Sequence, residues 1–334
     1  MNSTTDLNYF PIFLNTIRAN TIKTFNIYIR VVKNYVLYHS GSDLLTEEVI
    51  MNLIDNKVSV VYIHKSEKDE YNRYLIENLP AILSDPKTLI HEKATIAYST
   101  LSTTAQVVFE KPAMESLKIY KSSVSTVTDF VIMYEKAIYN LIRLTSHQFN
   151  VSTHSINVGL FALGLAKTLI GNDPNHDLHE MAAGFFLHDI GKSMMPKDIL
   201  NKHDSLTHNE WNIVKQHPYE GYKLLSRFNI LSDNIKTIVL QHHERKNGKG
   251  YPRGLRNDEI HIYAKICCIA DVFEALTSDR PYNKTNNKTG NSFRAFLTIK
   301  NEMQNEFDPF FFQQFILLFR DISRTEKRNS RLRP

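Results

Sequence analysis

The sequence contains no long hydrophobic run, because none of its apolar segments approaches the about 20 residues that a membrane-spanning helix needs. Its first residues also lack the basic and then apolar pattern of a signal peptide. Both absences predict a cytoplasmic protein without membrane insertion. Cysteine is scarce as well: Cys267 and Cys268 are the only two, adjacent in an apolar run, and we expect them to be reduced core residues.

A basic stripe interleaved with aromatic residues is also missing, and the formal net charge of +5 is mild. Nucleic-acid binding is therefore disfavoured. Part of the positive charge lies in residues 323–334, which we expect to form a basic flexible tail.

The first 110 residues lack a metal-ligand cluster and a glycine-rich phosphate loop. Partial alternation over residues 24–38 predicts a β-hairpin that turns at Lys33-Asn34, and residues 58–63 predict another strand. Helices are expected after Thr46 and over residues 69–83. Residues 1–110 are therefore predicted to be a small α+β domain with a regulatory, dimerising or docking role.

The rest of the chain has helical periodicity and no strand alternation. Residues 111–145 are predicted to be a helical linker, which could pack against a second copy in a homodimer. Residues 146–322 are predicted to form an all-α helical bundle, in which Pro218 stops a helix at His217. The expected fold class is mainly α, with the bundle preceded by the α+β domain.

Histidine is the residue present in excess. Of the 14 histidines, eleven fall between His147 and His261. Such a concentration in one region suggests metal chemistry there. The central segment is His188-Asp189, followed by Lys192: imidazole and carboxylate bind divalent metals, and an aspartate can bridge two ions. A lysine beside the metals suits a phosphate oxygen.

The candidate metal ligands come from five segments, four of them predicted helices with apolar faces, as in bundle cores that hold two metals. They are His154, His188, Asp189, His217, His242, His243 and Asp271. Any single histidine could instead be an ordinary core or surface residue, and Asp271 could pair with a buried arginine or cap a helix. The interpretation depends on their joint occurrence.

The order of these motifs resembles the HD-GYP family, a branch of the HD metal-dependent phosphohydrolases. The resemblance covers about residues 146–319. Its motifs are His154, His188-Asp189 with Lys192, His217-Pro218, His242-His243-Glu244, Gly248-Lys249-Gly250-Tyr251-Pro252, Asp271 and Ser278-Asp279-Arg280-Pro281-Tyr282.

The resemblance implies a helical domain that hydrolyses cyclic di-GMP to linear pGpG or onward to GMP. It implies a centre of two or three divalent metal ions, iron in the first place and manganese as the alternative. By position, one ion would take His154, His188, Asp189 and Asp271. The other would share Asp189 and take His217 and His242, with His243 as a further ligand or a neighbour of the ligands.

Around the metals, the resemblance implies catalytic roles for Asp189 and Lys192. Lys192 would bind the scissile phosphate, and Arg280 the second phosphate or a guanine face. Lys284 is a further substrate-side candidate. Tyr251 could contact the ligand or simply pack in its turn, and the Gly250-Tyr251-Pro252 loop is also associated with docking of a signalling protein.

Three positions depart from the family pattern. Asn150 stands where members with three metals carry a glutamate, which predicts two ions here. Asn247 and Asn283 replace an aspartate and a basic residue on the substrate side. These changes leave two alternatives beside the cyclic di-GMP phosphodiesterase: a weak or inactive protein that senses cyclic di-GMP or docks a partner, and a phosphohydrolase acting on another nucleotide.

Overall fold

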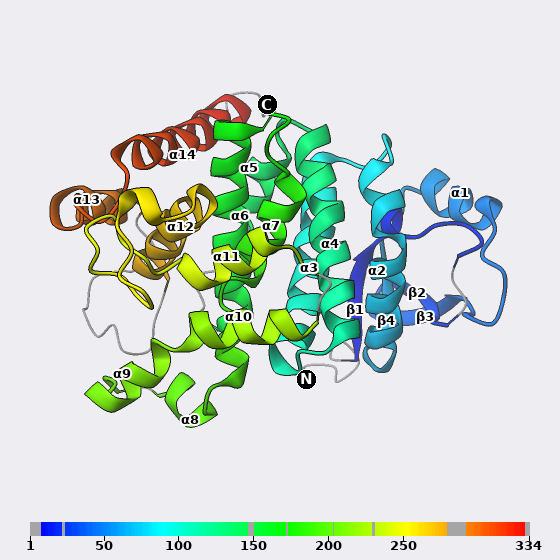
Figure 1. Cartoon of the computed structure of the whole chain (residues 1–334). Coiled ribbons are helices and arrows are strands. Elements are labelled where there is room, and N and C mark those ends of the chain that lie inside the picture. Colours follow the sequence, from blue (N-terminus) through cyan, green and yellow to red (C-terminus); the bar gives the residue numbers. More distant parts are fainter. Residues whose placement is uncertain are drawn as a thin grey trace. The chain divides into compact units, whose positions relative to one another are not determined.

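The computed structural model describes residues 8–21, 24–145, 150–171, 173–202, 204–228, 231–278 and 292–330. The chain divides into two compact units, residues 1–103 and residues 104–334 (Figure 1). The first unit combines a small sheet with helices and the second is helical, so the predicted fold class is confirmed.

A four-stranded antiparallel sheet forms the centre of the first unit, in the order β1-β4-β2-β3. Its strands are β1 (Tyr9–Phe13), β2 (Ile27–Val31), β3 (Asn34–His39) and β4 (Val60–His64). Strands β2 and β3 form the predicted hairpin, but its turn was placed one residue too late. Val31 pairs with Asn34, so the turn residues are Val32 and Lys33, and Val32 takes a positive φ of 59°.

The helices of this unit are α1 (Glu47–Asp55), α2 (Lys68–Ser84) and α3 (Ile90–Glu110), which continues past the division between the units. The side chain of Thr46 accepts a hydrogen bond from the amide of Val49 and thereby caps α1. Helix α2 packs on the core through Tyr71 and Tyr74, whose rings contact Phe25 with centroids 5.6 and 5.4 Å away. Aromatic packing thus holds α2 in place.

In the second unit, helices of varied length succeed one another. They are α4 (Met114–Met133), α5 (Ala137–Ile142), α6 (Val151–Ile170), α7 (Leu178–Leu187), α8 (Lys197–Leu200), α9 (His208–Val214), α10 (His217–Arg227), α11 (Asp233–Gln241), α12 (Ile262–Thr277), α13 (Ser292–Glu302) and α14 (Pro309–Ser330). None of the helices in the described ranges is long and apolar enough to cross a membrane.

Helix α6 is the centre of this bundle. Every residue from His154 to Ala166 is buried, and α5, α7, α12 and α14 pack around it. A helix that is apolar on all sides is stable only when neighbours cover every face. The prediction that Pro218 stops a helix at His217 is wrong. Helix α10 begins at His217, and Pro218 lies in its first turn, where a missing N–H leaves no helical hydrogen bond unmade.

Candidate metal centre

Helix ends bring most of the candidate ligands to one place. His188 directly follows α7, and Asp189 directly precedes the short 3-10 helix η4 (Ile190–Met194). His217 begins α10, and His242 follows directly after α11. Asp271 lies in the middle of α12, buried on the face that packs against α6 and His154.

All seven predicted ligands meet at this point, and they form two groups of metal-ligating atoms. One group holds His154, His188 and Asp271, and the other holds Asp189, His217, His242 and His243. Within each group the ligand atoms lie within 4.8 Å of one another.

The carboxylate of Asp189 connects the two groups. Its Oδ2 lies 3.2 Å from Nε2 of His154 and 3.5 Å from Nε2 of His188. Its Oδ1 lies 3.0 Å from Nε2 of His217 and 3.7 Å from Nε2 of His242. One oxygen thus faces each set of imidazoles, as a carboxylate that bridges two cations would.

Three of the histidines contact the same kind of backbone partner. Nδ1 of His188, His217 and His242 lies 2.9, 2.7 and 2.8 Å from the carbonyl oxygen of the residue three positions earlier. Because a carbonyl only accepts, each Nδ1 carries the proton, and Nε2 presents its lone pair to the centre. This is the tautomer that a metal ligand needs.

His154 is oriented by a residue that the sequence analysis missed. Its Nδ1 lies 2.5 Å from Oε2 of Glu274, and the other oxygen of Glu274 accepts a hydrogen bond of 3.3 Å from Asn157 Nδ2. Glu274 is buried in α12, three residues after Asp271. A carboxylate behind a histidine fixes the ring and raises its basicity toward a metal.

Burial and neighbouring charges determine the protonation of the cluster. Burial lowers the pKa of His242 to about 4 and also lowers the pKa values of His217 and His243. Burial acts in the same direction on His154, but Glu274, Asp189 and Asp271 outweigh it and raise that pKa to about 10.

The two aspartates stay ionised in spite of their burial. Burial would raise the pKa of Asp189, but Lys192 and His188 hold it well below the usual value. For Asp271 the stronger opposing influence is His243. Neutral imidazoles at His217, His242 and His243 beside ionised carboxylates are the donor set that divalent transition metals prefer. His154, whose pKa is raised, releases its proton when it binds a metal.

Several ligand atoms face one another without a proton between them. Nε2 of His217 and Nε2 of His242 are 3.1 Å apart, although each ring carries its proton on Nδ1. Nε2 of His188 and Oδ1 of Asp189 are buried and have no hydrogen-bond partner among the described residues. Opposed lone pairs in a buried site are costly unless a cation satisfies them, so these residues fit divalent metals.

A cavity of about 520 Å³ opens beside the cluster. It is lined by Val151, Lys192, Ile199, Leu200, Lys202, Ser205, Leu206, Trp211, Val214, His217, His243 and Tyr251. This volume is within the range of small-molecule sites. The cavity therefore reaches the predicted ligands His217 and His243 directly.

Two predicted substrate contacts, Lys192 and Tyr251, line this cavity. Nζ of Lys192 lies 2.5 Å from Oδ2 of Asp189, at the junction of the two ligand groups. The ring of Tyr251 lies 4.6 Å from the ring of His243, and its amide donates to the carbonyl of His243. Arg280 and Lys284, the other predicted contacts, lie outside the described residues.

Trp211 on α9 is a second residue that the sequence analysis missed. Its indole is 45% exposed and lies edge-on to Tyr251, with ring centroids 6.5 Å apart. As the only tryptophan of the chain, beside a cavity, it offers an aromatic face to a ligand. Only its position in space distinguishes it from other surface aromatics.

Two of the three asparagines that depart from the family pattern make local hydrogen bonds in the structure. Oδ1 of Asn150 accepts hydrogen bonds from the amide of Thr153 and the hydroxyl of Ser152, which caps α6. Oδ1 of Asn247 accepts a bond of 3.0 Å from the amide of Lys249. Asn283 lies outside the part of the chain that the structure describes.

A family model described as an HD domain matches residues 136–310. A cyclic di-GMP phosphodiesterase of Pseudomonas aeruginosa is 34% identical over 193 residues, which are 58% of this chain and 45% of that protein. A 3'3'-cGAMP-specific phosphodiesterase of Vibrio cholerae is 31% identical over 171 residues, 51% of this chain and 32% of that protein. The chain thus spans less than half the length of these curated relatives.

Among solved structures, the HDG"Y"P protein Bd1817 of Bdellovibrio bacteriovorus matches with a TM-score of 0.65 and 23% identity. The match covers 94% of this chain and 100% of that one. At this identity the likeness shows the fold, including a helical domain of the same architecture.

Proposed function

This chain belongs to the HD domain family, as its motifs predict, and from that membership we propose that it is a metal-dependent phosphodiesterase that hydrolyses cyclic di-GMP. The relative from Pseudomonas aeruginosa bears the name of that activity. The observation that carries the proposal is the position of Asp189, whose two oxygens face two separate sets of imidazole nitrogens.

We assign one divalent ion to His154, His188, Asp271 and Asp189, and a second to Asp189, His217, His242 and His243. The two groups of ligand atoms support this division. Iron is the favoured metal and manganese the alternative, since nitrogen and carboxylate ligands suit both. The use of Asn150 as a helix cap supports two ions rather than three.

A bound pair of divalent ions supplies Lewis acidity toward a phosphate and lowers the pKa of coordinated water. Hydrolysis adds one water oxygen to phosphorus and breaks one P–O bond to ribose, which opens the ring to pGpG. A second hydrolysis gives GMP. Asp189 fixes the two ion sites relative to each other, because it gives one carboxylate oxygen to each. Lys192 leaves its ion pair with Asp189 to bind the scissile phosphate.

The cavity supplies the contacts for the rest of the substrate. The exposed face of Trp211 and the ring of Tyr251 are suited to stack on a guanine base. Tyr251 packs against His243, which supports a substrate contact in preference to partner docking through the Gly250-Tyr251-Pro252 loop. We also propose Arg280 and Lys284 as further contacts to a phosphate or a guanine base.

The location that we propose is the cytoplasm, where both free cysteines stay reduced.

The test measures metal content and hydrolysis on the same anaerobically purified sample. The proposal expects about two equivalents of iron or manganese per chain and the formation of pGpG or GMP from cyclic di-GMP. A sample without bound metal would overturn the ligand assignment. Two ions with no hydrolysis but with binding of cyclic di-GMP would instead support the sensor alternative.

A second candidate substrate is another cyclic dinucleotide, 3'3'-cGAMP. It is favoured by the relatives from Vibrio cholerae, whose names state specificity for that compound. Competition between the two dinucleotides in one reaction, resolved by chromatography, separates the possibilities. A higher kcat/KM for 3'3'-cGAMP would assign the chain to the alternative.

A further inference from the structure

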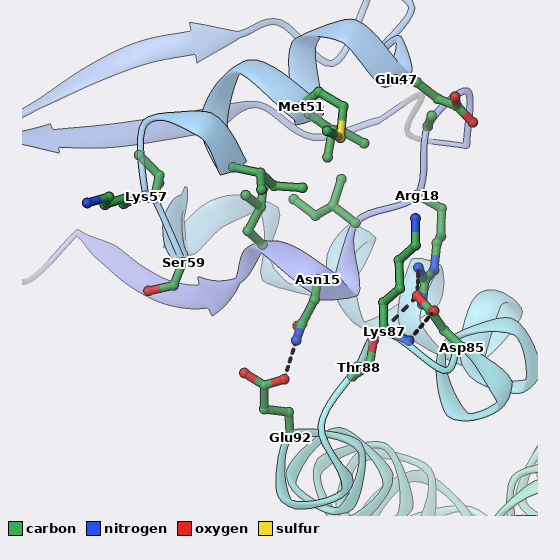
Figure 2. Close-up of a pocket in the computed structure, with 16 residues that line it drawn as sticks. Asn15, Arg18, Glu47, Met51, Lys57, Ser59, Asp85, Lys87, Thr88 and Glu92 are labelled. Atoms are coloured by element: carbon green, nitrogen blue, oxygen red, sulfur yellow. Dashed lines mark hydrogen bonds and ion pairs between the residues drawn. The ribbon is translucent and has the colours of Figure 1, made fainter.

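The first unit contains a cavity of about 550 Å³ that has no part in the metal centre (Figure 2). It is lined by side chains from the segment after β1, from α1, from the loop between α1 and β4, from the loop between α2 and α3, and from the first turn of α3. Its volume is in the range of small-molecule sites. All of its lining residues belong to one unit.

Helix α1 gives the cavity an apolar side. Glu47, Ile50, Met51 and Ile54 line it, at the spacing of one helix face. An amphipathic helix usually buries such a face, but Leu53 is the only buried residue of α1, and Met51 and Ile54 are each 50% exposed. The apolar face of α1 is therefore available to a ligand in the cavity.

Arg18 gives the opposite side a specific polar group (Figure 2). Its Nη1 forms an ion pair of 2.5 Å with Oδ2 of Asp85, which holds the guanidinium in place. Its Nε and Nη2 are buried and have no hydrogen-bond partner in the described part of the chain. These two nitrogens form the side-on edge of the guanidinium, whose parallel N–H groups match the two oxygens of a carboxylate.

Asn15 places an acceptor in the same cavity. Its Nδ2 donates to Oε2 of Glu92, and since a carboxylate only accepts, the orientation of the amide is fixed. Its Oδ1 is buried and also lacks a hydrogen-bond partner among the residues described. A ligand that satisfies this atom must carry an N–H or O–H donor.

The charges around the cavity limit the ligand further. Three cations, Arg18, Lys57 and Lys87, are balanced by three anions, Glu47, Asp85 and Glu92. A balanced rim favours a monoanion or a zwitterion over a phosphate dianion, which would have to approach the three carboxylates.

We propose that this cavity binds a small carboxylic acid that has a hydrogen-bond donor beside the carboxyl group and an apolar tail. Apolar α-amino acids and α-hydroxy acids share this chemistry. Because these polar atoms are buried in the structure, the side chains of Arg18 and Asn15 turn toward the cavity on binding. The carboxylate then takes the Nε and Nη2 edge of Arg18, the donor bonds Oδ1 of Asn15, and the tail covers Ile50, Met51 and Ile54.

Saturation-transfer NMR and calorimetry on the full chain test this site with four probes: leucine, leucic acid, isocaproic acid and isoamyl alcohol. The proposal expects leucine or leucic acid to bind most tightly, and their comparison identifies the donor as ammonium or hydroxyl. Isocaproic acid lacks the donor and should bind about tenfold more weakly, and the alcohol lacks the carboxylate and should bind more weakly still.

Two variants locate the binding. Arg18→Lys keeps the charge beside Asp85 but loses the fork, and Met51→Asp places a charge on the apolar side; each should weaken binding about tenfold or more. Leu44→Asp alters an exposed leucine outside the cavity and should leave binding unchanged. Thermal melting verifies that each variant is folded. Equal affinity for all four probes, no binding, or binding that survives both variants would overturn the proposal.

Discussion

His154 and Glu274 are 120 residues apart in the sequence, and Nδ1 of the histidine lies 2.5 Å from the carboxylate of the glutamate in the buried core. The contact joins α6 to α12. It also turns Nε2 of His154 toward Asp189 and Asp271, at 3.2 Å from each. Glu274 therefore positions a candidate ligand without being one.

Glu274→Gln tests this positioning role. The amide keeps the shape of the side chain but loses the charge that favours the proton on Nδ1, so metal affinity should fall about 10- to 100-fold. Metal titration of the chelator-treated variant measures the loss. Glu220→Gln, which removes a partly exposed carboxylate that pairs with Lys223, is the matched control. Unchanged metal affinity in Glu274→Gln would mean that the contact only packs α6 on α12.

Asp189→Ala should remove both ions, because one carboxylate faces both groups of ligand atoms. Elemental analysis of the purified variant should give close to no bound metal, against about two equivalents in the parent chain. Asp233→Ala, on the surface of α11, should keep the parent value. A variant at Asp189 that retained both ions would refute the shared-ligand assignment.

Lys192→Ala should separate chemistry from metal binding. Nζ of Lys192 contacts Asp189 and lines the cavity, but an ammonium is not a metal ligand. Metal content should therefore be unchanged, while kcat for cyclic di-GMP falls about 100- to 1,000-fold with the loss of charge stabilisation at the phosphate. The exposed Lys197→Ala serves as control, and a loss of metal in Lys192→Ala would contradict this role.

The seven candidate ligands could be chosen from sequence because each lies in a short motif, and the order of the motifs is informative. Glu274 resembles Asp271 in sequence, because it is an acidic residue in the same apolar helix, one turn later. No motif includes it, however, and it was not predicted. Trp211 and the lining of the cavity around Arg18 carry no such signal. Their residues come from separate segments that only the folded chain brings together.

The helical periodicity of the second half of the chain predicted a bundle, and the structure has long helices there, such as α6. Strand β1 was missed because Pro11 interrupts its pattern, and Tyr9–Phe13 pairs with a strand about fifty residues away. The turn at Val32 was misplaced because a β-branched residue at positive φ is rare, so that Asn34 looked the better turn residue.

Acid should destabilise the chelator-treated chain through its buried histidines. The folded pKa of His242 is about 4, against 6.5 for the ordinary residue, and burial also lowers the pKa values of His217 and His243. Between these two pKa values the unfolded chain binds protons that the folded chain does not, so the free energy of unfolding falls as the pH falls. His154, whose pKa is raised, acts in the opposite direction, and its contribution is lost only as the pH rises toward about 10.

Urea midpoints measured at about pH 7 and about pH 5 should show this loss, on the order of a few kcal/mol for the cluster. In His242→Gln the pH dependence should be shallower, whereas the exposed His208→Gln should keep the slope of the parent chain. A midpoint that does not change over this range would show that the histidines are not desolvated as the structure has them.

Gly191 allows η4 to lie against α10, and Gly191→Ala should disrupt that contact. A Cβ at this position would stand 1.9 Å from the carbonyl oxygen of His217 and 2.6 Å from the amide nitrogen of Gly221, so backbone would have to move. The expected loss of stability is about 3 kcal/mol or more, with a weaker metal site because His217 and Asp189 are displaced together. Gly164→Ala is the control, since its Cβ would meet side chains of Leu318 and Ile138 at 3.0 and 3.1 Å, which can adjust. If both variants melted at the temperature of the parent chain, the close approach of η4 to α10 would be wrong.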